Sequence, residues 1–229
     1  MTSIAQNLQT VRQRIARACV AAGRPLDSVR LLAVSKTFDV DALRAAAAAG
    51  QREFGESYLQ EALAKQQQLR DLDLVWHFIG PVQSNKTRAL AESFDWVHGI
   101  DRIKVAQRLS DQRPARLPPL DVCVQVNISG EASKSGCAPA EALDLCRAVA
   151  ALPRLRLRGL MAIPAPARTD SDPRLPYRQL HALFETIRSA GIALDTVSAG
   201  MSDDLEAAIM EGSTLVRVGT ALFGQRTKP

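Results

Sequence analysis

Short apolar runs and helical patterns alternate along almost the whole chain. The first predicted element is an amphipathic helix, which ends near the Gly-Arg-Pro sequence at residues 23–25. Its apolar face is formed by Ile4, Leu8, Val11, Ile15 and Ala18. Eight apolar runs follow, and helical patterns separate them. The runs span residues 30–36, 52–57, 75–80, 96–100, 121–129, 157–163, 194–201 and 215–224.

Strands that alternate with helices pair in parallel, so this order predicts an α/β fold. Eight strands in 229 residues favour a closed (β/α)₈ TIM barrel with an extra amino-terminal helix over an open doubly wound sheet. The runs at 52–57 and 96–100 are weak strands, so the open sheet remains the alternative. No shift of composition divides the chain, and we expect a single domain over residues 1–229. Two proline-rich stretches, 113–119 and 164–176, are the predicted loops.

The composition is that of an ordinary globular protein, with 46% hydrophobic and 23% charged residues. No apolar stretch approaches the roughly 18 residues of a membrane span, and residues 1–25 carry polar and basic side chains throughout, unlike a signal peptide. We therefore expect a cytoplasmic protein. Four cysteines without a C-x-x-C pattern argue against structural zinc and favour buried free thiols. The net charge of +5 comes from dispersed arginines, which argues against a nucleic-acid surface and is compatible with a phosphorylated small molecule.

Lys36 ends the apolar run LLAVSK, and barrels of this kind carry their active sites at the carboxyl ends of the strands. Side chains alternate along a strand, so Lys36 shares its side with Leu32 and Val34. Two interpretations are open: a solvated lysine at a strand end, or an amine that emerges from a packed layer. In the second case partial desolvation lowers the pKa of the amine, as a Schiff-base lysine requires.

Two glycine-containing turns lie at the ends of the last two predicted strands, where barrels often bind phosphate. In SAGMSDDLEAAIMEG, Ser202 or Asp203 can cap the next helix, and Glu206 can complete a capping box. The same turn can present backbone N–H groups to a phosphate, on the side away from its acidic residues. In RVGTALFG, Gly219 permits close approach of the backbone and Thr220 supplies a hydroxyl. Together the two turns predict a phosphate site.

Arg217 interrupts the last apolar run. Arginine is almost never buried without a partner, so either a carboxylate or a ligand heteroatom has to meet it. His77 and His98 also lie on or beside predicted strands. Hydrogen-bonded core histidines and catalytic histidines are both compatible with that pattern.

These residues lie in motifs by which the chain resembles the pyridoxal phosphate homeostasis proteins, single-domain relatives of the alanine racemase barrel domain. The motifs cover almost the whole chain in the family's order, and WHFIGPVQSNK together with GMSDDLEAAI is highly specific. The shared motifs are LLAVSKT, QREFGES, WHFIGPVQSNK, FDWVHGID, NISGEASKSG, LRGLMAIP, GMSDDLEAAI and STLVRVGTALFG.

The resemblance implies that pyridoxal 5′-phosphate (PLP) is the cofactor and that Lys36 carries it as an aldimine. It also implies that Arg217 faces the pyridine nitrogen. The other residues that it places around the cofactor, mainly at the phosphate, are Ser198, Met201 through its backbone, Ser202, Gly219 and Thr220. The family usually has asparagine where this chain has Ser57, so a contact expected at that position depends on a shorter side chain without an amide.

The function that the resemblance implies is intracellular PLP homeostasis, in which the protein buffers or delivers the cofactor without robust catalysis. Arg217 can only donate to the ring nitrogen and leaves it unprotonated, which makes PLP a poor electron sink. Racemisation also needs acid–base groups on both faces of the substrate carbon. The racemases use a tyrosine from an additional domain for one face, and neither Tyr58 nor Tyr177 lies in a matching motif.

Two other functions stay open at this point: a PLP-dependent amino-acid racemase, and a scaffold or binder of another phosphorylated ligand. Lys86 and Lys134 lie in predicted strand-end loops and are either secondary sites of PLP attachment or ordinary solvated lysines. The implied partners are PLP and, transiently, PLP-dependent apo-enzymes, with neither nucleic acid nor membrane. We expect no metal and, from the family, a monomer.

Overall fold

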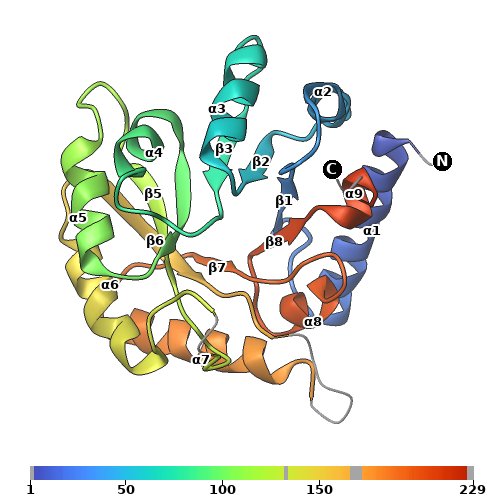
Figure 1. The fold of residues 1–229 in the computed structure, drawn as a ribbon. Helices are drawn as coiled ribbons and strands as arrows, with labels where there is room; N and C mark the ends of the chain where they lie inside the picture. The colour runs from blue at the N-terminus through green and yellow to red at the C-terminus, as the bar shows by residue number, and fades with distance from the viewer. Residues whose placement is uncertain (1–2, 132–133, 166–171, 226–229) are drawn as a thin grey trace.

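Eight parallel strands close into a barrel in which consecutive strands are neighbours and β8 pairs with β1 (Figure 1). The computed structural model describes residues 3–131, 134–165 and 172–225. The strands are β1 (Arg30–Val34), β2 (Glu53–Glu56), β3 (Val75–Phe78), β4 (Trp96–Ile100), β5 (Leu120–Gln125), β6 (Leu155–Met161), β7 (Thr196–Ser198) and β8 (Leu215–Val218). Each predicted run overlaps one strand. The predicted (β/α)₈ barrel is therefore confirmed, and the open sheet is excluded.

At least one α-helix lies between each pair of consecutive strands, as right-handed crossovers of a parallel barrel require. The helices are α1 (Ile4–Ala21), α2 (Val40–Ala48), α3 (Leu59–Gln68), α4 (Thr87–Ser93), α5 (Ile103–Gln112), the 3-10 helix η1 (Pro139–Glu141), α6 (Ala142–Ala150), α7 (Leu175–Ser189), α8 (Leu205–Met210) and α9 (Thr220–Phe223). The extra amino-terminal helix is α1, and it packs beside α8 and α9 (Figure 1). Its predicted apolar face is confirmed, since Leu8, Val11, Ile15 and Ala18 are buried.

The inside of the barrel differs from the apolar layer between the strands and the helices. It contains a small apolar cluster of Trp96, Cys123 and Met161 that is separate from the main core. The guanidinium groups of Arg30 and Arg158 lie 4.9 and 4.7 Å from the centre of the Trp96 ring, in cation–π geometry. Arg30 is the first residue of β1, so this layer lies toward the amino-terminal end of the barrel. The opposite end is the one at which Lys36 lies.

Both predicted loops can be compared with the structure. Residues 113–119 form no helix or strand, as predicted. In the stretch 164–176, residues 166–171 lie outside the described part of the chain. The helix α7 begins at Leu175 with Pro176 in its first turn, where a proline needs no backbone donor. The last two residues of that predicted loop are therefore helical.

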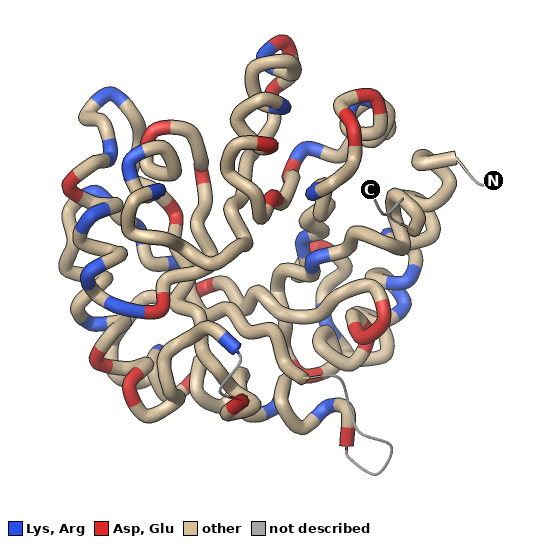
Figure 2. Tube along the Cα trace, in the orientation of Figure 1, with Lys and Arg blue, Asp and Glu red and all other residues tan. Residues whose placement is uncertain are grey.

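Lys and Arg are interspersed with Asp and Glu around the outside of the barrel (Figure 2), which matches the dispersed charge of the sequence. The four cysteines, Cys19, Cys123, Cys137 and Cys146, are buried free thiols as predicted. Among the described residues, no helix combines the length and the apolar character needed to cross a bilayer.

Candidate functional site

Lys36 lies two residues beyond β1, in a tight turn at the carboxyl end of the barrel. The Phe38 N–H closes this turn by donating to the Ser35 carbonyl at 3.1 Å. Lys36 and Thr37 are therefore the central residues of the turn. The Lys36 side chain is half-buried. Partial exposure of this kind suits a reactive lysine at the mouth of a site.

The pairing of strands brings other predicted site residues beside Lys36. Leu32 pairs with Arg217 across β1 and β8, so these two side chains lie on the same side of the sheet. Lys36 lies in the turn that follows β1. Beyond the last β1–β8 pair, Gly219 and Thr220 continue the chain past the end of β8. On the other flank Ser57 follows β2, and it is also half-buried. The structure thus confirms the predicted position of Lys36, Ser57, Gly219 and Thr220 beyond the carboxyl ends of adjacent strands.

The turns after β7 and β8 meet at a hydrogen bond, since the Ala221 N–H donates to the Ser202 hydroxyl at 3.3 Å. Within residues 3–131, 134–165 and 172–225, the backbone N–H groups of Ser202, Gly219 and Thr220 have no protein acceptor. A side chain at Gly219 would bring its Cβ to 3.1 Å from the Val34 carbonyl oxygen, so glycine allows this close approach. These three donors, together with the hydroxyls of Ser202 and Thr220, fit a phosphate group.

The predicted capping of α8 is wrong. Neither Ser202 nor Asp203 caps the helix, because Asp204 occupies the cap position and no side chain bonds there. The Asp204 carboxylate instead accepts hydrogen bonds from the Met201 N–H and, at 2.6 Å, from the Tyr177 hydroxyl. This arrangement orders the turn that contains Met201, whose side chain is exposed.

Arg14 of α1 explains why Glu206 completes no capping box. The Arg14 guanidinium donates to both carboxylate oxygens of Glu206, at 2.6 and 2.8 Å, and to the Ser202 carbonyl at 2.9 Å. Helix α1 thereby fixes the turn after β7. The sequence analysis missed this role of Arg14, because the two partners lie about 190 positions further along the chain.

Arg217 is buried and is bound by neutral oxygens. It donates to the Ser198 carbonyl at 2.6 Å, to the Ser198 hydroxyl at 2.9 Å and to the Ala162 carbonyl at 2.9 Å. Burial lowers the pKa of the guanidinium to about 10, and the nearby Tyr177 and Asp204 oppose that shift. Arg217 is therefore still a cation at neutral pH, and it presents only N–H donors to its surroundings.

A buried chain of hydrogen bonds extends from Arg217 through the barrel interior. The Ser198 hydroxyl lies 2.9 Å from His98 Nδ1, and His98 Nε2 lies 2.9 Å from His77 Nδ1. His77 Nε2 in turn lies 3.4 Å from the Glu53 carboxylate, without hydrogen-bond geometry. The predicted strand histidines are thus core residues that connect to the predicted site.

The direction of this chain follows from its two ends. Arg217 can only donate, so the Ser198 hydroxyl accepts from it, and its own proton is available for His98 Nδ1. His98 then donates from Nε2 to His77 Nδ1, which leaves the His77 proton on Nε2, facing Glu53. The opposite direction would turn a lone pair of His77 toward a carboxylate. Burial lowers the pKa of both imidazoles, so both rings are neutral at pH 7.

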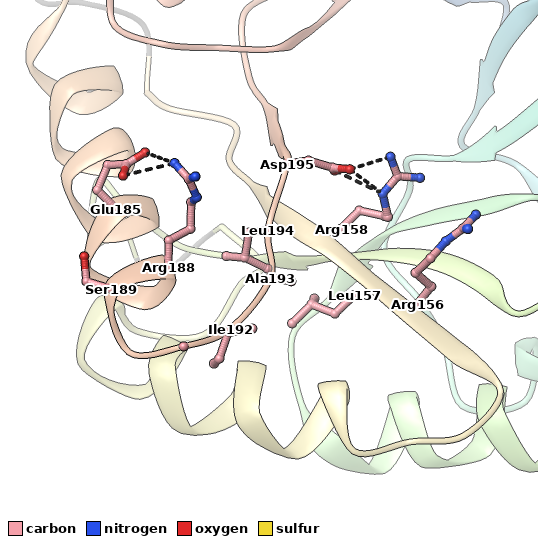
Figure 3. Close-up of a pocket in the computed structure, with 11 residues that line it drawn as sticks. Arg156, Leu157, Arg158, Glu185, Arg188, Ser189, Ile192, Ala193, Leu194 and Asp195 are labelled. Carbon is pink, nitrogen blue, oxygen red and sulfur yellow. Dashed lines mark hydrogen bonds and ion pairs between the residues drawn. The ribbon is translucent and has the colours of Figure 1, made fainter.

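A cavity of the described structure lies at the opposite end of the barrel. It measures about 710 Å³ and lies between the start of β6, the end of α7 and the segment that leads into β7 (Figure 3). Its arginines are paired: Arg158 contacts Asp195 at 2.7 Å, and Arg188 contacts Glu185 at 2.9 Å. Because these cations are already neutralised and lie far from Lys36, this cavity is not the candidate site.

Lys134 and Lys86 have different surroundings. Lys134 lines a cavity of about 130 Å³ with Gln125 and Ile163, near the carboxyl ends of β5 and β6, and its Nζ is 3.9 Å from the Glu131 carboxylate. Lys86 is half-buried and precedes the first turn of α4. Lys86 follows β3 and Lys134 follows β5, and neither strand pairs with β1.

The fold and the strand-end site together define a barrel of the alanine racemase type. The family model described as alanine racemase, N-terminal domain, matches residues 2–227. Solved alanine racemases share the fold alone: the enzyme of Corynebacterium glutamicum is 20% identical with a TM-score of 0.70, over 98% of this chain and 61% of the racemase.

Relatives of similar length narrow the family. The pyridoxal phosphate homeostasis protein of Pseudomonas aeruginosa is 60% identical over 226 residues, 99% of this chain and 97% of that protein. The Escherichia coli protein of the same name is 53% identical over 229 residues, 99% of this chain and 98% of its own. PipY of Synechococcus elongatus, solved with PLP bound, is 36% identical with a TM-score of 0.84, over 97% and 100% of the two chains. This chain belongs to the alanine racemase N-terminal domain family and, within it, to the pyridoxal phosphate homeostasis proteins.

Proposed function

We propose that this protein binds PLP covalently through Lys36 and acts in intracellular PLP homeostasis, by buffering or delivering the cofactor. The observation that carries the proposal is the pair of turns after β7 and β8. Three backbone N–H groups there have no acceptor in the part of the protein that the structure describes, and they lie at the same end of the barrel as Lys36. The PLP-bound relative of the same fold supports PLP as the phosphorylated ligand.

Each site residue has a separate task in this proposal. The aldehyde of PLP condenses with a primary amine with loss of water, and Lys36 supplies that amine. Ser202, Gly219 and Thr220 bind the phosphate, and the backbone of Met201 borders it. Ser198 holds Arg217 so that the guanidinium meets the pyridine nitrogen, and Ser57 borders the site from β2.

The protein groups favour a carrier over an enzyme. Arg217 is a cation without a proton acceptor, so a ring nitrogen that meets it stays unprotonated. The Tyr177 hydroxyl donates to Asp204, and burial raises its pKa, so it stays protonated at neutral pH and is not available as a base. Tyr58 is 56% exposed, so it does not form the second, water-excluded face that racemisation needs.

The remaining parts of the proposal concern the setting. We infer one functional domain over residues 1–229, which acts as a monomer and meets PLP-dependent apo-enzymes only transiently. Four buried free thiols support a reducing compartment such as the cytoplasm.

Borohydride reduction tests the covalent part of the proposal. The purified protein, incubated with PLP and then reduced, is expected to yield one main pyridoxyl-labelled peptide, with the label on Lys36. Reduction makes the linkage irreversible, so peptide mapping by mass spectrometry identifies the lysine. A label mainly on Lys86 or Lys134 would contradict the proposal, and a colourless, unlabelled protein would favour another phosphorylated ligand.

A PLP-dependent racemase is the second candidate, supported by the shared fold. Solvent deuterium incorporation at Cα distinguishes the two functions, because racemisation requires that this proton be removed and replaced. For a carrier we expect negligible incorporation into a panel of amino acids in the presence of PLP-loaded protein. Rapid incorporation into any one of them would assign a racemase instead.

A further inference from the structure

A buried lysine of α3 lies directly behind the turn that contains Lys36. Lys65 is only 5% exposed, and its Nζ donates to the Ser35 carbonyl at 2.7 Å, to Glu56 at 2.8 Å and to Glu61 at 2.5 Å. A protonated amine has three N–H donors, so these three acceptors satisfy it completely. A fully satisfied buried cation is rigidly held, and here one of its ligands is the residue before Lys36.

The residue after Lys36 is attached to the same cluster. The Thr37 N–H donates to Glu61 at 2.5 Å, through the carboxylate oxygen that also binds Lys65. The Ser35 hydroxyl donates to Glu56 at 2.6 Å. The neighbours of Lys36 on both sides are therefore bonded to one network, which we call the Lys65 cluster: Lys65, Glu56 and Glu61.

The turn needs this support because its backbone is strained. Thr37 has φ of 69°, the only positive φ of a non-glycine residue among those described. The third position of such a turn normally requires glycine, and a β-branched residue is a clear outlier there. Strained residues of this kind persist only where the surroundings hold them. The hydrogen bonds from Thr37 and Ser35 to the Lys65 cluster supply that constraint.

We propose that Lys65 is a positioning residue for Lys36, which it holds at the mouth of the barrel by fixing the strained turn through Ser35 and Glu61. The inference rests on the proposed function in so far as Lys36 is the residue that binds PLP. The three acceptors already use all the N–H groups of the Lys65 amine, so this amine has none left for a ligand. Lys65 therefore acts on Lys36 through the backbone of the turn.

A purely structural ion pair does not account equally well for this arrangement. Replacing a buried ion pair by apolar residues is often neutral for stability, so a buried lysine is weak evidence for stabilisation alone. In this cluster Glu56 Oε2 has no hydrogen-bond partner in the described part of the chain, and burial raises the pKa of that carboxyl despite Lys65. The cluster is thus not optimised as a stabilising pair, whereas its contacts concentrate on the two neighbours of Lys36.

The test compares Lys65→Met with Arg113→Met. Arg113 is a matched control, because it is 4% exposed and donates to the carbonyls of Ala91, Phe94 and Pro118, at the end of α5 and away from Lys36. In PLP-free protein, Lys65→Met should speed amide hydrogen exchange at Thr37 and Phe38 by at least about tenfold. PLP binding, measured by equilibrium dialysis below both unfolding midpoints, should weaken by about tenfold. Arg113→Met should lower the unfolding temperature but change neither quantity.

Thr37→Gly separates positioning from general stability. Glycine adopts a positive φ without strain, so the turn no longer needs the Lys65 cluster to hold it. Introducing Thr37→Gly into Lys65→Met should therefore restore at least about a third of the lost PLP affinity, measured on a logarithmic scale. Such coupling between two substitutions is expected for residues of one network. The same change in Arg113→Met should restore nothing. If Lys65→Met does not fold, Glu61→Ala replaces it in the test. Glu61 is the partly exposed member of the cluster and binds Thr37 directly. Glu61→Ala should therefore also speed amide exchange in the turn and weaken PLP binding.

The outcomes distinguish the two proposals. Unchanged exchange at Thr37 and Phe38 in Lys65→Met, or equal losses of PLP affinity in Lys65→Met and Arg113→Met, would overturn the positioning role. Failure of PLP to attach to Lys36 in the unmodified protein would overturn the proposed function, while the exchange measurement would still decide whether Lys65 holds the turn.

Discussion

Lys36→Ala is expected to abolish covalent PLP binding completely. The variant should lack the yellow absorption band of the PLP-loaded protein and should give no pyridoxyl-labelled peptide after borohydride reduction. Lys36 is the lysine at the strand end beside Gly219 and Thr220, and no other amine occupies the turn after β1. PLP should still bind through its phosphate, but about 100-fold more weakly, because the bond to the amine is lost.

Pyridoxine 5′-phosphate provides the control for this prediction. It has the phosphate and the ring of PLP but no aldehyde, so it should bind the unmodified protein and Lys36→Ala with the same affinity. Lys134→Ala is the matched lysine variant, and it should keep the yellow band. A yellow, reducible Lys36→Ala protein would contradict the assignment, and its labelled peptide would name the lysine that binds instead.

Most of the strands could be predicted because they are short apolar runs with clear boundaries, whereas the runs at 52–57 and 96–100 were weak. A parallel barrel buries both faces of its strands, so β5 and β8 are entirely buried and most of their residues are apolar. The closure of the sheet into a barrel could be predicted from the number of apolar runs. Arg217 and Lys36 stood out in the sequence because charge is rare inside such runs, and strand order then placed them at one end of the barrel.

The supporting contacts could not be predicted, because they join residues far apart in sequence. His98 and Ser198 are 100 positions apart and meet only when the barrel closes. Lys65 follows Glu61 by four residues on α3, a spacing typical of an exposed helical ion pair. The structure buries it instead, since Glu56 at the end of β2 and the Ser35 carbonyl reach the same amine. The sequence analysis gave no special role to Lys65 for this reason.

Acidification is expected to destabilise the protein through His98. Its pKa is well below the usual value of 6.5, first because the ring is buried and then because His77 and two arginines repel a charge there. The folded state therefore keeps His98 neutral while the unfolded chain takes up a proton below pH 6.5. The unfolded state then binds more protons, so the free energy of unfolding should fall as the pH drops below 6.5, with a slope that approaches at most about 1.4 kcal/mol per pH unit.

Other groups change this slope in known directions. The pKa of His77 is also lowered by burial, although Glu53 opposes the shift, so His77 adds to the loss. Glu56 acts in the opposite sense: its pKa is raised in the folded state, which therefore takes up its proton first as the pH falls. That gain begins near the raised pKa of Glu56 and is complete at the usual glutamate value, so it opposes the histidines over part of the window. Two imidazoles act against one carboxyl, so we still expect a net loss of stability on acidification.

Denaturant unfolding across this pH range measures the effect. His98→Gln removes the titrating ring, so its slope should be smaller, by at most about 1.4 kcal/mol per pH unit, whatever its stability at pH 7. Met161→Leu is the control, because it alters the packing of the barrel interior without a titratable group and should keep the original slope. An equal slope in His98→Gln and the unmodified protein would mean that the folded and unfolded states take up the His98 proton equally, which would contradict the lowered pKa of this ring. The folded protein would then reverse the hydrogen bond between Ser198 and His98 below about pH 6.5, because a doubly protonated His98 donates to Ser198 instead of accepting from it.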